Sequence, residues 1–351
     1  MQNLGIKYIK QSRKNNTVHL AILLILLVSV ILSGLFEERA EIVFGMESHS
    51  VKDAITVTIG GSYNPSLIDR QKNTVFSGEI TRLFANSDLA IISLAAPISA
   101  GSAATEKYPV IQQSVKTMLE ESKINIVQIS NHRIMSHGAV GLLNTKGFLD
   151  SNRILQIGAG FSEAEALAPY FFLSEGTTVA VMALNANPPP GWEAGKNRLG
   201  VAAFTSDSSR KIVKEASEKS DLLIVLISFS NENTDQQQRN VARDLIEQGA
   251  HVVIGTGTGP LKRVETYKQG VIFYNIGNLS SSGSMYSYIN ESALLRIVVF
   301  GAGKAEIKAV PLIAGHSTVR LAGVGYLAYK IKRRLGGSVW ELSASKEVVV
   351  Q

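Results

Sequence analysis

Hydrophobic and polar residues follow two different periods along the chain, and these predict strands and helices in turn. Short runs rich in Val, Ile and Leu predict strands at 55–59, 89–94, 124–129, 178–184, 222–229, 251–255 and 271–276. Apolar residues that recur every three or four positions predict helices at 110–121, 138–150, 208–219 and 235–248. A glycine-containing turn between 293–300 and 305–310 predicts a hairpin. This alternation is typical of an α/β domain with at least one largely parallel sheet.

The N-terminal segment has a different pattern. Residues 20–36 form a run of 17 residues without a charge, about 25 Å long as a helix and sufficient to cross a bilayer core. Four basic residues and no acidic ones precede it. The positive-inside rule therefore predicts a single-pass anchor in the cell membrane, with residues 1–19 cytoplasmic and the main domain extracytoplasmic. A cleaved signal peptide is the alternative. The polar residues 37–53 are interpreted as a spacer.

Composition and charge exclude several classes of protein. The chain has 351 residues and no cysteine, so disulfides and thiolate metal sites are excluded. The net charge is +6, but residues 1–36 and 316–351 each carry +4, which leaves the region between them at −2. Because a nucleic-acid-binding domain carries its positive charge on the folded body, this distribution argues against nucleic acid as a partner.

The loops that follow the predicted strands carry few groups suited to catalysis. Ligands of α/β folds bind at the carboxyl ends of the strands, where a hydrolytic metal site needs several carboxylates or imidazoles. Here these loops are small and polar, and only His132 and Arg133 are basic. The loop 255–259 reads Gly-Thr-Gly-Thr-Gly. It has no Walker lysine, and Pro260 removes a donor, so a permissive turn is favoured over a phosphate cradle.

The order of the strand ends and four stretches around them resemble the CapA/PgsA family of poly-γ-glutamate capsule synthesis proteins. The stretches are SDLAIISLAAPI (87–98), MSHGAVGLLNT (135–145), IGAGFSEAEA (157–166) and QGAHVVIG with LKRVETYKQGVIFYNIGN (248–278). The resemblance runs from about residue 55 to 299 and implies a calcineurin-like metallophosphoesterase fold over 54–315, a sandwich of sheets flanked by helices. It also implies partners, namely an anionic polymer, a cytoplasmic amide ligase and a small integral membrane subunit.

The same resemblance marks the positions where the family carries metal ligands, and most are vacated here. The vacated positions are Gly61, Ala95, Ser136, Ser228, Thr256, Gly257 and Gly259. The residues left as candidates to line the cleft are Asn131, His132, Arg133, Glu265 and Asn278. Because ligands are lost from five loops at once, the resemblance implies a non-catalytic accessory subunit that needs no cofactor.

Two other functions remain as alternatives. A metal-dependent hydrolase could hold a divalent metal through displaced ligands, with Asn131 and His132 as remnants. The chain could instead be an extracellular polyanion-binding module that uses the basic tail 316–351, which includes a predicted helix at 322–335. The tail residues that would contact a polyanion or lipid headgroups are Lys330, Lys332, Arg333 and Arg334.

Overall fold

The computed structural model divides the chain into two units, residues 1–49 with 323–329 and residues 50–322 with 330–351. The residues it describes are 23–24, 54–63, 75–98, 111, 113, 115–230, 233–257, 259–280, 290–301, 303–315, 318–323, 325–342 and 348–350. Except for the helical, exposed Leu23 and Leu24, the predicted cytoplasmic segment, anchor and spacer lie outside these residues. No helix in the described part is long and apolar enough to span a membrane.

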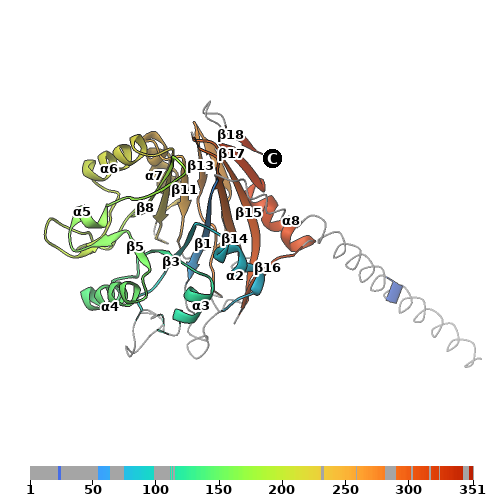
Figure 1. Cartoon of the computed structure of the whole chain (residues 1–351), viewed down its shortest axis with the longest axis horizontal. Coiled ribbons are helices and arrows are strands. Elements are labelled where there is room, and N and C mark those ends of the chain that lie inside the picture. The colour runs from blue at the N-terminus through green and yellow to red at the C-terminus, as the bar shows by residue number, and fades with distance from the viewer. Residues whose placement is uncertain are drawn as a thin grey trace, which may run out of the picture. The chain divides into compact units, whose positions relative to one another are not determined.

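The larger unit contains two large sheets and one short two-stranded ribbon (Figure 1). The first sheet has the order β18 (Val348–Val350), β17 (Val339–Leu342), β15 (Ala305–Ala314), β14 (Glu291–Val299), β1 (Ile55–Tyr63), β3 (Leu89–Leu94), β4 (Ile126–Gln128) and β5 (Leu155–Ile157), with β16 (Thr318–Leu321) and β2 (Val75–Phe76) paired beside β15. From β1 to β5 the strands are parallel, and β14, β15 and β17 pair antiparallel.

The second sheet has the order β12 (Val264–Tyr267), β13 (Gly270–Phe273), β11 (Val252–Gly255), β10 (Leu222–Ser228), β8 (Thr177–Asn185) and β7 (Tyr170–Ser174). Its four central strands are parallel, whereas β7 and β12 pair antiparallel at the two edges. A short ribbon of β6 (Ala159–Gly160) and β9 (Gly200–Val201) lies outside both sheets.

The parallel strands are apolar on both faces because both faces are covered. In β3, Leu89 and Ile91 belong to the core between the two sheets, while Ala90 and Ile92 face a second core with the helices α2 (Gly78–Ala85), α3 (Val115–Glu121) and α4 (Gly138–Ser151). A third core packs the outer face of the second sheet against α6 (Asp207–Glu218) and α7 (Asp235–Glu247). The layers are therefore helices, sheet, sheet and helices.

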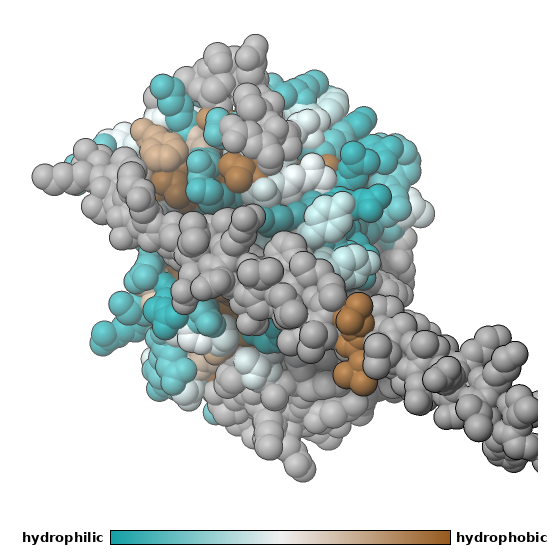
Figure 2. All heavy atoms as spheres, turned by 90° about the vertical axis from the view of Figure 1, so that its right-hand side faces the viewer, coloured by the Kyte–Doolittle hydropathy of each residue, from teal (hydrophilic) through white to brown (hydrophobic). Residues whose placement is uncertain are grey.

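Local signals explain where the helices begin. Ser206 caps α6 by accepting from the Ser209 amide, and Thr234 forms a reciprocal capping box with Gln237 at the start of α7. Two shorter helices are α5 (Glu163–Ala166) and α8 (Tyr326–Leu335). Figure 2 shows that the described residues on one side of the molecule are mostly hydrophilic, with hydrophobic ones in small separate groups.

The structure confirms the mixed α/β class, and the predicted central strands and helices are present with shifted ends. The helix predicted at 110–121 begins at Val115, and the strand predicted at 124–129 covers Ile126–Gln128. The first sheet continues past the predicted end of the domain at residue 315, because β16 and β17 both pair with β15.

Candidate functional site

The two sheets meet at the carboxyl ends of their parallel strands, where the sequence places the candidate cleft. The Ser62 hydroxyl at the end of β1 donates to the Thr256 carbonyl, which follows β11. Beside it, Ser62 forms a bridge to Asn278, and the Ser62 carbonyl accepts from the Leu279 amide at 2.8 Å. The fold therefore brings Gly61, Thr256 and Asn278 to the same edge of the two sheets.

Main-chain atoms fill the vacated position in β1. A Cβ atom on Gly61 would overlap the carbonyl oxygen of Gly277. That same oxygen accepts from the Ser62 amide at 3.2 Å, so it is fixed in place. Gly277 has φ +83°, a left-handed conformation that suits glycine. The structure thus leaves no room at position 61 for any side chain, including a ligand carboxylate.

The glycine loop after β11 is closed in a similar way. A Cβ on Gly257 would lie 2.7 Å from the Phe229 carbonyl oxygen, and one on Gly259 would lie 3.1 Å from Asn275 Nδ2. The Thr256 amide donates to the Ile227 carbonyl at 3.0 Å. The backbone at Thr256 and Gly257 is therefore packed against its neighbours, and an imidazole at Gly257 or Gly259 would displace the atoms around it.

The remaining vacated positions hold small, mostly buried side chains. Ala95 is buried, and its amide donates to the Tyr63 carbonyl at 3.0 Å. Ser228 is fully buried, and its Oγ has no hydrogen-bond partner among the described residues. Ser136 ends a turn through its amide, which donates to the Arg133 carbonyl at 2.9 Å.

Asn131 and His132 remain from the resemblance, but the structure gives Asn131 another role. Its Nδ2 donates to the Leu94 carbonyl, and its Oδ1 accepts from the Arg133 amide at 2.7 Å. Both ends of the amide are therefore used to hold the turn. His132 is partly buried, and its buried Nδ1 has no hydrogen-bond partner among the described residues.

These residues do not fit a divalent metal. Within the part of the chain that the structure describes, no group of three or more His, Asp or Glu side chains could hold one. His251 precedes β11, at the strand end opposite the site, and its Nδ1 accepts from the Leu223 amide at 3.0 Å. The oxygens nearest the vacated positions belong to serine, threonine, asparagine and the backbone, which offer no negative charge to such an ion.

His132 predicts a measurable pH dependence of stability. Burial, with a smaller effect of Arg133, lowers the pKa of His132 from 6.5 to about 4. Below pH 6.5 His132 is protonated in the unfolded chain, whereas in the folded chain it takes up this proton only near pH 4. We expect the free energy of unfolding to be highest above pH 6.5 and to fall by up to about 3 kcal/mol toward pH 4 through this residue.

The measurement is urea unfolding at several pH values, for the wild type and for His132→Asn. In the variant, the free energy of unfolding should no longer show the part of its pH dependence that comes from His132, while the contributions of other titratable groups remain. An unchanged slope would show that His132 titrates normally in the folded chain.

Glu265 lies away from the vacated positions, and its carboxylate connects different secondary-structure elements through hydrogen bonds. Its Oε1 accepts from Arg243 Nε at 2.8 Å, and its Oε2 accepts from the Tyr274 hydroxyl at 2.5 Å. Burial tends to raise the pKa of Glu265, but these hydrogen bonds outweigh it and the pKa lies below its usual value. Glu265 therefore connects α7 with β12 and the end of β13.

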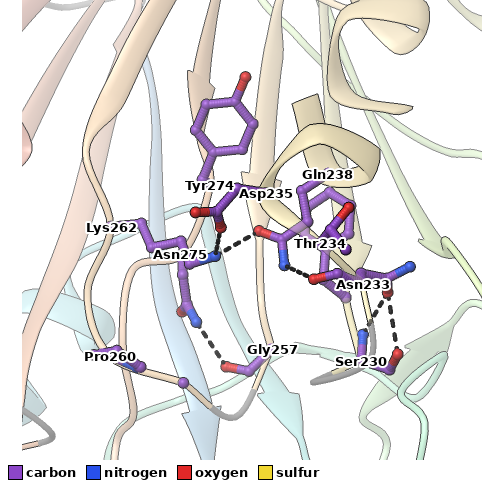
Figure 3. Close-up of a pocket in the computed structure, with 12 residues that line it drawn as sticks. Ser230, Asn233, Thr234, Asp235, Gln238, Gly257, Pro260, Lys262, Tyr274 and Asn275 are labelled. Atoms are coloured by element: carbon purple, nitrogen blue, oxygen red, sulfur yellow. Dashed lines mark hydrogen bonds and ion pairs between the residues drawn. The ribbon is translucent and has the colours of Figure 1, made fainter. Parts of the chain in front are cut away.

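A pocket of about 470 Å³ lies beside the glycine loop (Figure 3). It is bounded by the loop after β10, the first turn of α7 and the segment around Lys262. Its polar lining includes Ser230, Asn233, Thr234, Asp235, Gln238, Lys262 and Asn275. Sequence reasoning missed Lys262 and Asp235, because single charges in loops and first helical turns usually face solvent. Only Asp235, at a helix start, carried any signal.

The basic tail has two kinds of cations. Lys330 and Arg334 form ion pairs with the buried Glu291 at 2.7 and 2.9 Å. Lys332 and Arg333 are exposed and form no ion pair with any described residue. A polyanion or headgroup would therefore meet Lys332 and Arg333 first.

Comparisons with known proteins agree with the resemblance. The family model described as bacterial capsule synthesis protein PGA_cap matches residues 56–282. The PGA biosynthesis protein CapA of Bacillus subtilis (strain 168) is 24% identical over 205 residues, which are 57% of this chain and 53% of the relative, about half of its length. The capsule biosynthesis protein CapA of Bacillus anthracis is 21% identical over 324 residues, 87% of this chain and 78% of the relative.

Two solved structures are also similar at low identity. The NAD nucleotidase NadN of Haemophilus influenzae has a TM-score of 0.46 and 10% identity, covering 85% of this chain and 54% of that one. A 5'-nucleotidase precursor from Thermus thermophilus has a TM-score of 0.44 and 14% identity, and the match covers 74% of this chain and 54% of that one. Family membership rests on the sequence match, which covers more than half of the chain. The chain belongs to the bacterial capsule synthesis protein PGA_cap family.

Proposed function

We propose that this protein is a membrane-anchored, non-catalytic accessory subunit in the synthesis or export of poly-γ-glutamate or a similar anionic capsule polymer. The family and the names of its CapA relatives support a role in capsule synthesis. The observation that carries the non-catalytic part is the Gly277 carbonyl, which occupies the space where a side chain at position 61 would stand.

Two-metal hydrolysis depends on a set of fixed ligands that hold both ions about 4 Å apart. A chain that had lost one ligand could compensate with a neighbour. Here main-chain atoms close the space at Gly61 in β1 and at Gly257 after β11, two strands of different sheets. Such a chain keeps the fold but lacks the ligands that metal-dependent hydrolysis needs. This suits a subunit that holds other subunits together or guides the polymer.

The proposal includes a place and partners for this subunit. An anchor at 20–36 would hold the domain on the outer side of the cell membrane, next to the point where the polymer emerges. The partners in this arrangement are the cytoplasmic amide ligase and the small integral membrane subunit that the family resemblance implies. The domain would act by contact, since no step of the proposal requires a bond to be made or broken by this chain.

Metal analysis of the purified full-length chain tests the proposal. We expect substoichiometric manganese, zinc and iron without chelator treatment, and no turnover of a generic phosphodiester with added manganese, because the residues at the strand ends do not fit a metal. His132→Ala is the matched control, and it should change neither measurement.

Two metal ions per chain, together with turnover that His132→Ala abolishes, would contradict the proposal. That result would establish the alternative, a hydrolase with displaced ligands around Asn131 and His132. Stoichiometric metal with turnover that survives the His132 variant would also contradict the proposal, and would place the metal on other residues of this chain.

A further inference from the structure

The pocket beside the glycine loop holds a lysine whose position is fixed on three sides. The Lys262 amide donates to the Asn275 carbonyl at 2.9 Å, which fixes its backbone. Its ammonium donates to Gln238 Oε1 at 2.8 Å and to Asp235 Oδ1 at 2.7 Å (Figure 3). An ammonium has three protons, so one remains for a further acceptor. Lys262 is therefore held ready at the pocket, unlike a freely moving surface lysine.

The two acceptors of Lys262 differ in how firmly they are held. Gln238 is buried, and its Nε2 donates to the Asn233 carbonyl at 3.2 Å, so the amide is fixed at both ends. The side chain of Asp235 is 85% exposed, against 32% for Lys262. An exposed carboxylate contributes little to stability through such a pair, so it can be exchanged at low cost. Asp235 is the exchangeable member of this set.

A second cation lies on the same helix as this carboxylate. Arg239 lies one turn after Asp235 on α7, is exposed and forms no ion pair with any described residue. The hydrogen bond from Lys262 lowers the pKa of the Asp235 carboxyl first, and the charge of Arg239 adds to this effect. Asp235 is thus paired with Lys262 and has Arg239 one turn away on α7, and these three side chains together carry a net positive charge.

We propose that this pocket binds carboxylate groups of an acidic, amide-linked chain, and that an incoming carboxylate takes the place of Asp235 at the Lys262 ammonium. When no ligand is bound, the Asp235 carboxylate occupies the place of the ligand carboxylate and keeps Lys262 in position. The remaining lining suits an amide-linked chain, because Ser230, Thr234 and the Gly257 carbonyl offer neutral hydrogen-bonding groups beside the charge. Naming the γ-linked glutamate polymer as the natural ligand rests on the proposed function.

Binding of a fluorescent γ-linked oligoglutamate to the full-length chain, followed by anisotropy, tests this site. We expect Lys262→Met to weaken binding about tenfold or more, because it removes the positioned ammonium. Asp235→Asn should strengthen binding about threefold, because the competing carboxylate is gone. Opposite effects of two neighbouring substitutions are not expected from a general loss of structure.

Lys268→Met is the matched control. Lys268 also forms an exposed ion pair, with Glu247 at 2.8 Å, but it does not line the pocket. Its replacement should leave binding unchanged. Equal losses for Lys262→Met and Lys268→Met, or no gain for Asp235→Asn, would overturn the proposal and show diffuse attraction of a polyanion.

This test is independent of the metal analysis. A metal-free, inactive chain that fails to bind the oligomer at Lys262 would remove the pocket site and leave the accessory role in place. Metal-dependent turnover together with binding that depends on Lys262 would remove the non-catalytic role and retain the site.

Discussion

Replacing Gly61 with alanine is expected to destabilise the folded chain by about 3 kcal/mol or more. The new methyl group would overlap the Gly277 carbonyl oxygen, and relief requires β1 and the segment after β13 to move apart. That movement would also break the hydrogen bond from the Ser62 amide to the same oxygen. Because protein interiors are close-packed, neither strand has free space to yield into.

Gly147→Ala provides the matched control. Gly147 lies within α4, and apart from its chain neighbours and the adjacent helix backbone no described atom lies within 4 Å of the position that a Cβ would take, so the same methyl group there should be neutral or stabilise by up to about 1 kcal/mol. Urea unfolding monitored by tryptophan fluorescence measures both, since Trp340 is buried against Phe273 at 5.0 Å between ring centroids. Equal stability of the two variants would refute the closure of position 61.

The aspartate variant at the same position tests function as well as packing. Gly61→Asp restores the residue that the family resemblance places there, yet we expect at least the destabilisation of Gly61→Ala and no gain of metal binding. A carboxylate alone cannot rebuild a site whose other positions are Ala95, Ser228 and Thr256. Metal uptake by a stable Gly61→Asp chain would mean that the cleft opens readily.

The sequence predicted the central strands well because they are buried on both faces and read as continuous apolar runs. It missed the edge strand β12, a short strand of half-buried residues such as Glu265 and Tyr267 in which Thr266 is exposed. The sequence analysis also ended the domain at residue 315, because the segment after it is rich in basic residues. Strand β17 lies in that segment and joins the first sheet, but it is short and offers few apolar positions as a signal. Local periodicity indicates long central elements better than short edge ones.

At the candidate site, too, features that depend on neighbouring residues in the sequence could be predicted, and contacts between residues far apart in the sequence could not. The loss of ligands at Gly61 and Gly257 was readable from the family pattern. Its structural consequence was not, because the atom that fills the space at Gly61 belongs to Gly277, more than two hundred residues later. The pairing of Lys262 with Asp235 was missed for a similar reason, since it joins a loop to the first turn of α7, which only the fold brings together.

The C-terminal helix α8 provides the second large effect. Glu291 begins β14 and is 1% exposed, and its two carboxylate oxygens lie 2.7 Å from Lys330 Nζ and 2.9 Å from Arg334 Nη1. The double variant Lys330→Met, Arg334→Met would leave this carboxylate buried without a partner. We expect a loss of about 3–5 kcal/mol in the free energy of unfolding, as for other buried pairs broken from one side.

Two further variants separate this ion pairing from other effects of the helix. Lys332→Met with Arg333→Met removes the same number of charges from exposed positions of α8 and should change stability by less than about 0.5 kcal/mol. Adding Glu291→Gln to the first double variant should restore most of the loss, because the buried charge disappears with its partners. Urea unfolding of the three variants measures these differences. Equal stabilities of the two double variants would mean that Glu291 does not depend on Lys330 and Arg334, and that α8 is held only by its apolar face of Ile331 and Leu335.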